Sequence, residues 1–131
     1  MDNRSNNFLC PCCRSVLNIE NNIIFSVKTQ GNRKGLLLLS TKLGDYAVKN
    51  HETLMIEKGE KVNFFCPICK ESLSANDVND NLARVIMQDD DGNEFQILFS
   101  IVAGEFCTYM VADDNFKAFG DNSGIYFNEG S

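Results

Sequence analysis

The sequence predicts a mostly-β fold, and three observations point to it. Short apolar runs alternate with clusters of Gly, Asn and Asp that favour turns. Two near-identical cysteine motifs stand far apart in the chain. The 131 residues are 44% hydrophobic, which suits a single domain over residues 1–131 with one core. The 23% charged residues and the lack of a long uncharged apolar run exclude collagen-like, disordered and transmembrane classes.

The first half of the chain predicts one β-hairpin and several short strands. An apolar run over Ile23–Thr29 is followed by a polar turn at 30–35 and a second apolar run over Leu36–Thr41. Two such runs joined by a turn cluster are typical of a hairpin. Further short strands are expected at Tyr46–Val48, Thr53–Ile56 and Lys61–Phe65, separated by turn signals at Gly44-Asp45 and Glu57–Glu60.

The second half predicts an antiparallel β meander over residues 82–131. Strands at Leu82–Gln88 and Glu94–Ile101 flank the turn sequence Asp89–Asn93, which is a strong hairpin signal. A third strand is expected at Glu105–Ala112. Asp113 is expected to cap a short helical turn over Asp114–Phe119 that ends at Gly120, and the apolar tail residues Ile125, Tyr126 and Phe127 are expected to dock as a last strand or on the core.

An internal repeat links the two cysteine motifs. Shifting the chain by 56 residues aligns residues 7–17 (NFLCPCCRSVL) with residues 63–73 (NFFCPICKESL), and six of the eleven positions are identical. The alignment pairs Cys10 with Cys66 and Cys13 with Cys69, whereas Cys12 falls on Ile68. Two thiolates three positions apart on a tight turn can reach one metal ion at about 2.3 Å, so two turns supply four sulfur ligands.

The side chains around the motifs fit this interpretation. Four thiolates on Zn²⁺ leave a formal charge of −2, and the cations Arg14 and Lys70 directly follow the second cysteine of each motif. Apolar residues before and after the turns are expected to pack around the ion and exclude water: Phe8, Leu17, Phe64 and Leu73. The sequence therefore predicts one metal site with the ligands Cys10, Cys13, Cys66 and Cys69.

The paired C-P-x-C motifs resemble the zinc-ribbon family of four-cysteine domains, which includes rubredoxin-like relatives. The resemblance covers about 22 residues and implies one structural zinc ion within a ribbon formed by residues 7–17 and 63–73. Ordinary ribbons separate the motifs by about 15 to 20 residues. Here 52 residues lie between Cys13 and Cys66, so we expect a folded β insertion over residues 18–62.

Charge and targeting features narrow the function further. The net charge is −6, made up of +3 before Cys66 and −9 from Cys66 onward, which makes general nucleic-acid binding unlikely on electrostatic grounds. The N-terminus has no secretory signal pattern, so we expect a cytoplasmic protein without a membrane segment. The favoured function is a non-enzymatic module with structural zinc that binds a partner protein. Neither the partner nor the oligomeric state is indicated by the sequence.

Two alternative functions stay open at this point. A rubredoxin-like iron centre would transfer electrons, although that family usually carries Gly where Arg14 and Lys70 stand, and the close approach of backbone N–H groups to sulfur would then be lost. A nucleic-acid or transcription-associated ribbon would use the only basic patch of the sequence, which otherwise forms a solvated hairpin tip: Lys28, Arg33, Lys34 and Lys42.

Other candidate motifs fail on their spacing, and no catalytic residue is assigned. The acidic run Asp89–Asn93 would place Met87 at the first ligand position of an EF-hand calcium loop. His51 begins a zinc-protease-like motif whose second histidine is replaced by Met55. Cys12 is expected to be a spare thiol or a packing residue, and Cys107 a small buried hydrophobe.

Overall fold

The computed structural model describes residues 6–42, 48–50, 54, 56–105, 107–112 and 116–120. Within these ranges the chain forms β-strands and no helix. The strands are β1 (Asn7–Leu9), β2 (Asn18–Ile19), β3 (Asn22–Thr29), β4 (Lys34–Ser40), β5 (Val48–Asn50), β6 (Val62–Phe65), β7 (Leu82–Gln88), β8 (Glu94–Ser100), β9 (Thr108–Val111) and β10 (Phe116–Phe119). A mostly-β fold is thus confirmed.

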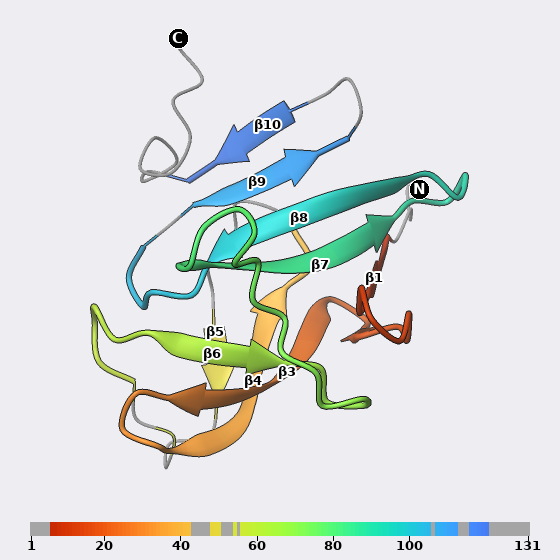
Figure 1. Cartoon of the computed structure of the whole chain (residues 1–131). Coiled ribbons are helices and arrows are strands. Elements are labelled where there is room, and N and C mark those ends of the chain that lie inside the picture. Colours follow the sequence, from red (N-terminus) through yellow and green to blue (C-terminus); the bar gives the residue numbers. More distant parts are fainter. Residues whose placement is uncertain are drawn as a thin grey trace, which may run out of the picture.

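The strands form two antiparallel sheets, which we call the N-sheet and the C-sheet. The N-sheet has the order β2-β3-β4-β5, and β6 also pairs with β3. The C-sheet has the order β1-β7-β8-β9-β10. In Figure 1, β7 to β10 lie in the upper part of the view, and β3, β4 and β6 lie below them.

Both hairpins form where the apolar runs and the turn clusters between them predict them. Every second side chain of β3 is buried, which is the pattern of a strand with one face on the core. β3 and β4 match the strands expected at Ile23–Thr29 and Leu36–Thr41 to within two residues, and β7 and β8 match Leu82–Gln88 and Glu94–Ile101 equally closely. The strands expected at Lys61–Phe65 and Glu105–Ala112 are present in shorter form as β6 and β9.

The expected helical turn over Asp114–Phe119 is wrong in the part that the structure describes. Phe116–Phe119 is the strand β10, which pairs with β9 from Phe116↔Val111 to Phe119↔Thr108. The ring of Phe116 stacks on Tyr109 of β9, with ring centroids 5.8 Å apart. Pairing with a free strand edge and an aromatic cross-strand contact therefore outweigh the local capping signal.

Three further expectations fall wholly or partly on residues outside the described ranges. Tyr46–Val48 overlaps β5 only at Val48. Of Thr53–Ile56, only Leu54 and Ile56 are described, and neither is in a strand. The tail residues Ile125, Tyr126 and Phe127 lie beyond residue 120.

The strand pairs β3–β4 and β4–β5 of the first half are repeated as β7–β8 and β8–β9 in the second half. Ser26 pairs with Leu36 in the β3–β4 hairpin, and Ile86 pairs with Gln96 in the β7–β8 hairpin. Both residues of the second pair stand 60 positions after the corresponding residues of the first pair. The same shift relates the next pair of strands, because Leu37↔Asn50 between β4 and β5 corresponds to Ile97↔Met110 between β8 and β9. The repeat seen in the cysteine motifs therefore extends through the sheets.

The two halves exchange their first strands. β1, which leads into the first cysteine motif, pairs with β7 of the second half, as in Phe8↔Met87. β6, which leads into the second motif, pairs with β3 of the first half, as in Val27↔Phe64. Because the exchange is reciprocal, the halves are related by an approximate two-fold rotation, and each sheet is completed by a strand from the other half.

One hydrophobic core joins the two sheets. The side chains expected around the metal site are all buried, with exposed fractions of 0% for Phe8, 3% for Leu17, 6% for Phe64 and 2% for Leu73. Phe64 packs edge-to-face on the rings of Phe25 and Phe99, each with a centroid distance of 5.1 Å. These aromatic contacts thus connect β3 and β6 of the N-sheet with β8 of the C-sheet.

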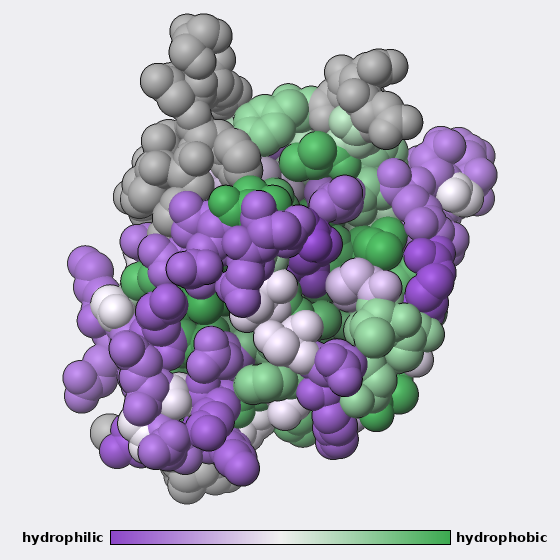
Figure 2. Space-filling model, in the orientation of Figure 1, coloured by the Kyte–Doolittle hydropathy of each residue, from purple (hydrophilic) through white to green (hydrophobic). Residues whose placement is uncertain are grey.

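The face of the molecule drawn in Figure 2 carries both polar and apolar side chains. On the face in Figure 2, hydrophilic side chains cover the lower left and the projecting β7–β8 turn at the right, and green apolar residues lie between them. Among the described residues, no helix is long and apolar enough to cross a membrane.

Candidate metal centre

The first cysteine motif, which we call knuckle 1, is a tight turn directly after β1. The amide of Arg14 donates to the carbonyl of Cys10 at 2.9 Å, and the amide of Cys10 donates to the carbonyl of Ser15 at 3.0 Å. Arg14 adopts a left-handed backbone with φ of 62°. This conformation reverses the chain, so that Leu17 returns to bond the carbonyl of Phe8 at 2.7 Å.

The second motif, knuckle 2, has the same backbone after β6. Lys70 donates to the carbonyl of Cys66 at 2.9 Å, and Cys66 donates to the carbonyl of Glu71 at 3.0 Å. Lys70 has φ of 69°, close to the value for Arg14. Knuckle 1 and knuckle 2 therefore present their two cysteines in the same way.

The four sulfur atoms form one cluster. The Sγ atoms of Cys10, Cys13, Cys66 and Cys69 all lie within 4.8 Å of one another. Two reciprocal pairs, Cys10–Cys69 and Cys13–Cys66, each have an S···S distance of 3.8 Å. A tetrahedron with metal–sulfur bonds of about 2.3 Å has edges of about 3.8 Å, whereas a disulfide needs about 2.05 Å. The geometry fits four ligands around one ion.

Backbone N–H groups point at the two buried sulfurs. The amides of Cys12 and Cys13 donate to Cys10 Sγ at 3.3 and 3.4 Å. In knuckle 2, the amides of Ile68 and Cys69 donate to Cys66 Sγ, both at 3.3 Å. These bonds stabilise thiolates in place of water, since Cys10 and Cys66 are each 0% exposed. All four donors are backbone amides of the CxxC turns themselves.

The left-handed backbone at Arg14 and Lys70 has a further consequence. We expected side chains at these positions to prevent the close approach of N–H groups to sulfur, and this expectation is wrong. Both residues adopt the positive φ that glycine would adopt there, and the N–H···S bonds form in both turns. The cost of a left-handed non-glycine residue is about 1 kcal/mol, which the surrounding turn must offset.

The pKa values of three of the thiols, Cys10, Cys13 and Cys69, are shifted in different directions. Hydrogen bonds from the side chain and backbone of Ser15 lower the pKa of Cys13 to about 6. Burial raises the pKa of Cys10. The Glu71 amide lowers the pKa of Cys69, but burial and the neighbouring thiols outweigh it and raise this pKa to about 12. A bound cation would remove this competition, because its charge favours all four thiolates together.

The two cations that follow the knuckles have different surroundings. Arg14 is bonded through Nη2 to Oε2 of Glu94 at the start of β8. Among the described residues no ion pair joins Lys70 to an acidic side chain. The charge of Arg14 is therefore shared with Glu94, a partner that sequence reasoning missed because Glu94 lies 80 positions away.

The remaining sequence candidates lie away from the cluster or have ordinary roles. Cys12 is exposed on the tip of knuckle 1, whereas Cys107 is buried beside Leu82 and Tyr109, and burial raises its pKa. The Asp89 carboxylate accepts the amides of Asp91 and Asn93 at 3.0 and 2.9 Å, so it closes the hairpin turn. His51 lies outside the described residues.

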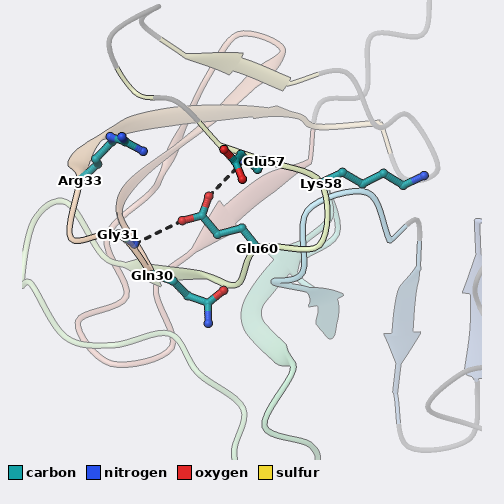
Figure 3. Close-up of a pocket in the computed structure, with 6 residues that line it drawn as sticks. All are labelled: Gln30, Gly31, Arg33, Glu57, Lys58 and Glu60. Carbon is teal, nitrogen blue, oxygen red and sulfur yellow. Dashed lines mark hydrogen bonds between the residues drawn. The ribbon is translucent and has the colours of Figure 1, made fainter.

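A shallow polar depression lies beside the β3–β4 turn, and Figure 3 draws its lining. Glu60 spans it, because its carboxylate accepts the amide of Glu57 at 3.1 Å and the amide of Gly31 at 3.3 Å. These backbone bonds lower the pKa of Glu60. The Glu60 carboxylate therefore connects the β3–β4 turn to the segment that enters β6.

The comparisons with known proteins found no match for this chain among family models, curated proteins or solved structures.

Proposed function

We propose that this chain is a non-enzymatic module that holds one structural zinc ion through Cys10, Cys13, Cys66 and Cys69 and binds a partner protein through its surface. The observation that carries the metal part is the sulfur cluster with its 3.8 Å S···S pairs. Four thiolates fill a tetrahedral ion, so no position is left for a substrate or an activated water. The ion's role is then in folding.

The position of the cluster supports a structural role. Knuckle 1 follows β1, which belongs to the C-sheet, and knuckle 2 follows β6, which belongs to the N-sheet. One ion bound to both knuckles would cross-link the two sheets. Such ions contribute about 10 to 16 kcal/mol of apparent binding free energy at neutral pH, which is as large as the whole free energy of unfolding of a typical domain, about 5 to 15 kcal/mol.

Charge and exposure support a protein as the partner. The half of the chain that starts at Cys66 carries a net charge of −9, which opposes an extended nucleic acid. Apolar side chains are exposed at and next to the knuckles, with exposed fractions of 49% for Val16, 63% for Ile19 and 58% for Ile68. Side chains of this kind supply the apolar part of a protein interface.

Metal analysis of untagged protein tests the proposal. We expect colourless protein with one equivalent of zinc, and loss of the ion and of the folded state in Cys66→Ser. The matched control is Cys12→Ser, which removes an exposed thiol next to the cluster and leaves zinc content and folding unchanged. Folded wild-type protein without metal would contradict the proposal.

A second candidate, an iron centre that transfers electrons, is favoured by the N–H···S bonds to Cys10 and Cys66. Hydrogen bonds to thiolate sulfur stabilise the reduced form and set the potential of such centres. Protein purified under the same conditions would then be red, and a reductant would bleach its visible absorption. The absorption spectrum thus separates the two candidates.

A further inference from the structure

Two matched rows of side chains lie at the ends of the two hairpins. In the C-sheet, Gln88 of β7 lies between Asn7 of β1 and Glu94 of β8. The Glu94 carboxylate accepts Gln88 Nε2 at 3.2 Å and also binds Arg14 of knuckle 1. In this row the Glu94 carboxylate accepts hydrogen bonds from both the Gln88 carboxamide and the Arg14 guanidinium.

The corresponding row of the N-sheet carries lysines at the positions equivalent to Gln88, Glu94 and Arg14. Lys28 of β3 pairs with Asn63 of β6 on one side and with Lys34 of β4 on the other. Lys28 and Lys34 therefore correspond to Gln88 and Glu94 under the 60-residue shift. Lys70 of knuckle 2 corresponds to Arg14 and has the same left-handed backbone. The row thus has three cations and lacks the carboxylate.

We call these three lysines the lysine row, and no described acidic side chain neutralises them. Lys34 and Lys70 are exposed and Lys28 is half-buried, and no ion pair involves them within the described ranges. Like charges directly opposite in a sheet destabilise it. Glu71 follows Lys70 but is exposed, and Glu60 is already bound to the amides of Glu57 and Gly31.

We propose that the lysine row binds a carboxylate of an acidic segment in a partner protein, in the position that Glu94 occupies at the matched site. The proposal rests on the proposed function, because it names the chemistry of the partner. The matched row of the C-sheet favours a carboxylate as the ligand, since the Glu94 carboxylate binds the equivalent side chains there. The net charge of −6 disfavours a long polyanion such as a nucleic acid.

The test uses zinc-loaded protein and a fluorescently labelled, end-blocked hexaglutamate peptide. Fluorescence anisotropy measures the dissociation constant at low and at physiological salt. We expect saturable binding that weakens with salt, and a loss of about tenfold or more in Lys34→Glu/Lys70→Glu, because exposed charge contacts are individually weak and add up. The matched control is Lys42→Glu/Lys49→Glu, which has the same net charge, is exposed at both positions, and should lose less than about threefold.

A single substitution gives an independent measurement. Lys34→Glu should supply the missing carboxylate from within the chain and pair with Lys70, as Arg14 pairs with Glu94. We expect this variant to lose peptide binding and to unfold at a slightly higher temperature than the wild type. Lys28 lies opposite position 34 and gains from the reversal as well, so the comparison is Lys34→Glu/Lys70→Ala. A melting temperature of this double variant equal to that of Lys34→Glu would show that Lys70 takes no part.

Three results would overturn the proposal. The first is no binding to the peptide at low salt, and the second is an equal loss in both double variants. The third is tighter binding of a single-stranded oligonucleotide through the same lysines, which would make the row a phosphate site. Zinc content and circular dichroism of each sample keep the tests separate, because metal loss would count against the proposed function and not against the lysine row.

Discussion

Phe64→Ala tests whether the aromatic cluster joins the two sheets. The ring is 6% exposed and makes edge-to-face contacts at 5.1 Å with Phe25 and with Phe99. Truncating a buried phenylalanine usually costs about 3 to 5 kcal/mol, which includes the lost transfer energy and the cavity. Two aromatic contacts of about 0.5 to 1.5 kcal/mol each are lost as well, so we expect a cost of about 4 kcal/mol or more.

The control is the next residue of the same strand. Phe65 is half-buried and points to the opposite face of β6, so Phe65→Ala should cost about 1 kcal/mol. Denaturant unfolding of zinc-saturated samples, followed by circular dichroism, gives the free energy of unfolding of each variant. A cost below about 2 kcal/mol for Phe64→Ala, or equal costs for the two variants, would refute the packing argument.

Three further predictions concern the knuckles. Lys70→Gly should raise the free energy of unfolding by about 0.5 to 1 kcal/mol, because glycine adopts φ of 69° without strain. A lower free energy of unfolding in a denaturant titration would count against the left-handed turn. In zinc-loaded protein only the exposed Cys12 should react quickly with a thiol reagent, and a second fast thiol would mean that a proposed ligand is free. Zinc affinity should fall at least about a hundredfold for each unit of pH from 9 to 7, because Cys10 and Cys69 have raised pKa values and give up their protons on binding. Cys13, with its pKa of about 6, should add a further proton below that value. Chelator competition showing less than tenfold per unit would contradict this.

The hairpins and the cysteine cluster were accessible from sequence because their signals are local. The apolar runs of β3 and β4 and the turn residues between β7 and β8 each act within about twenty residues. The cluster was predicted from two copies of one motif, since four sulfurs at ligand spacing have few alternatives to metal. Each hairpin signal and each cysteine motif lies within a short stretch of sequence, and the repetition of the motif indicates that its two copies meet.

Features that depend on distant partners were not predictable in the same way. The exchange of β1 and β6 has no local signal, because either strand presents the same alternation to any partner edge. The repeat of the sheets was hidden because core positions tolerate different apolar residues, as at Phe25 and Val85 or Val27 and Met87. β10 was predicted as a helical turn since its pairing with β9 is invisible in the sequence.

The reciprocal strand exchange means that neither half is self-sufficient. A peptide ending before β6 would have an incomplete N-sheet and only two of the thiols needed to surround an ion. Two such peptides could each complete the sheet and the metal site of the other, because the two halves of the chain are arranged like the subunits of a symmetric dimer. Cutting the chain between β5 and β6 should therefore yield fragments that reassemble with zinc, and joining the halves covalently makes assembly independent of protein concentration.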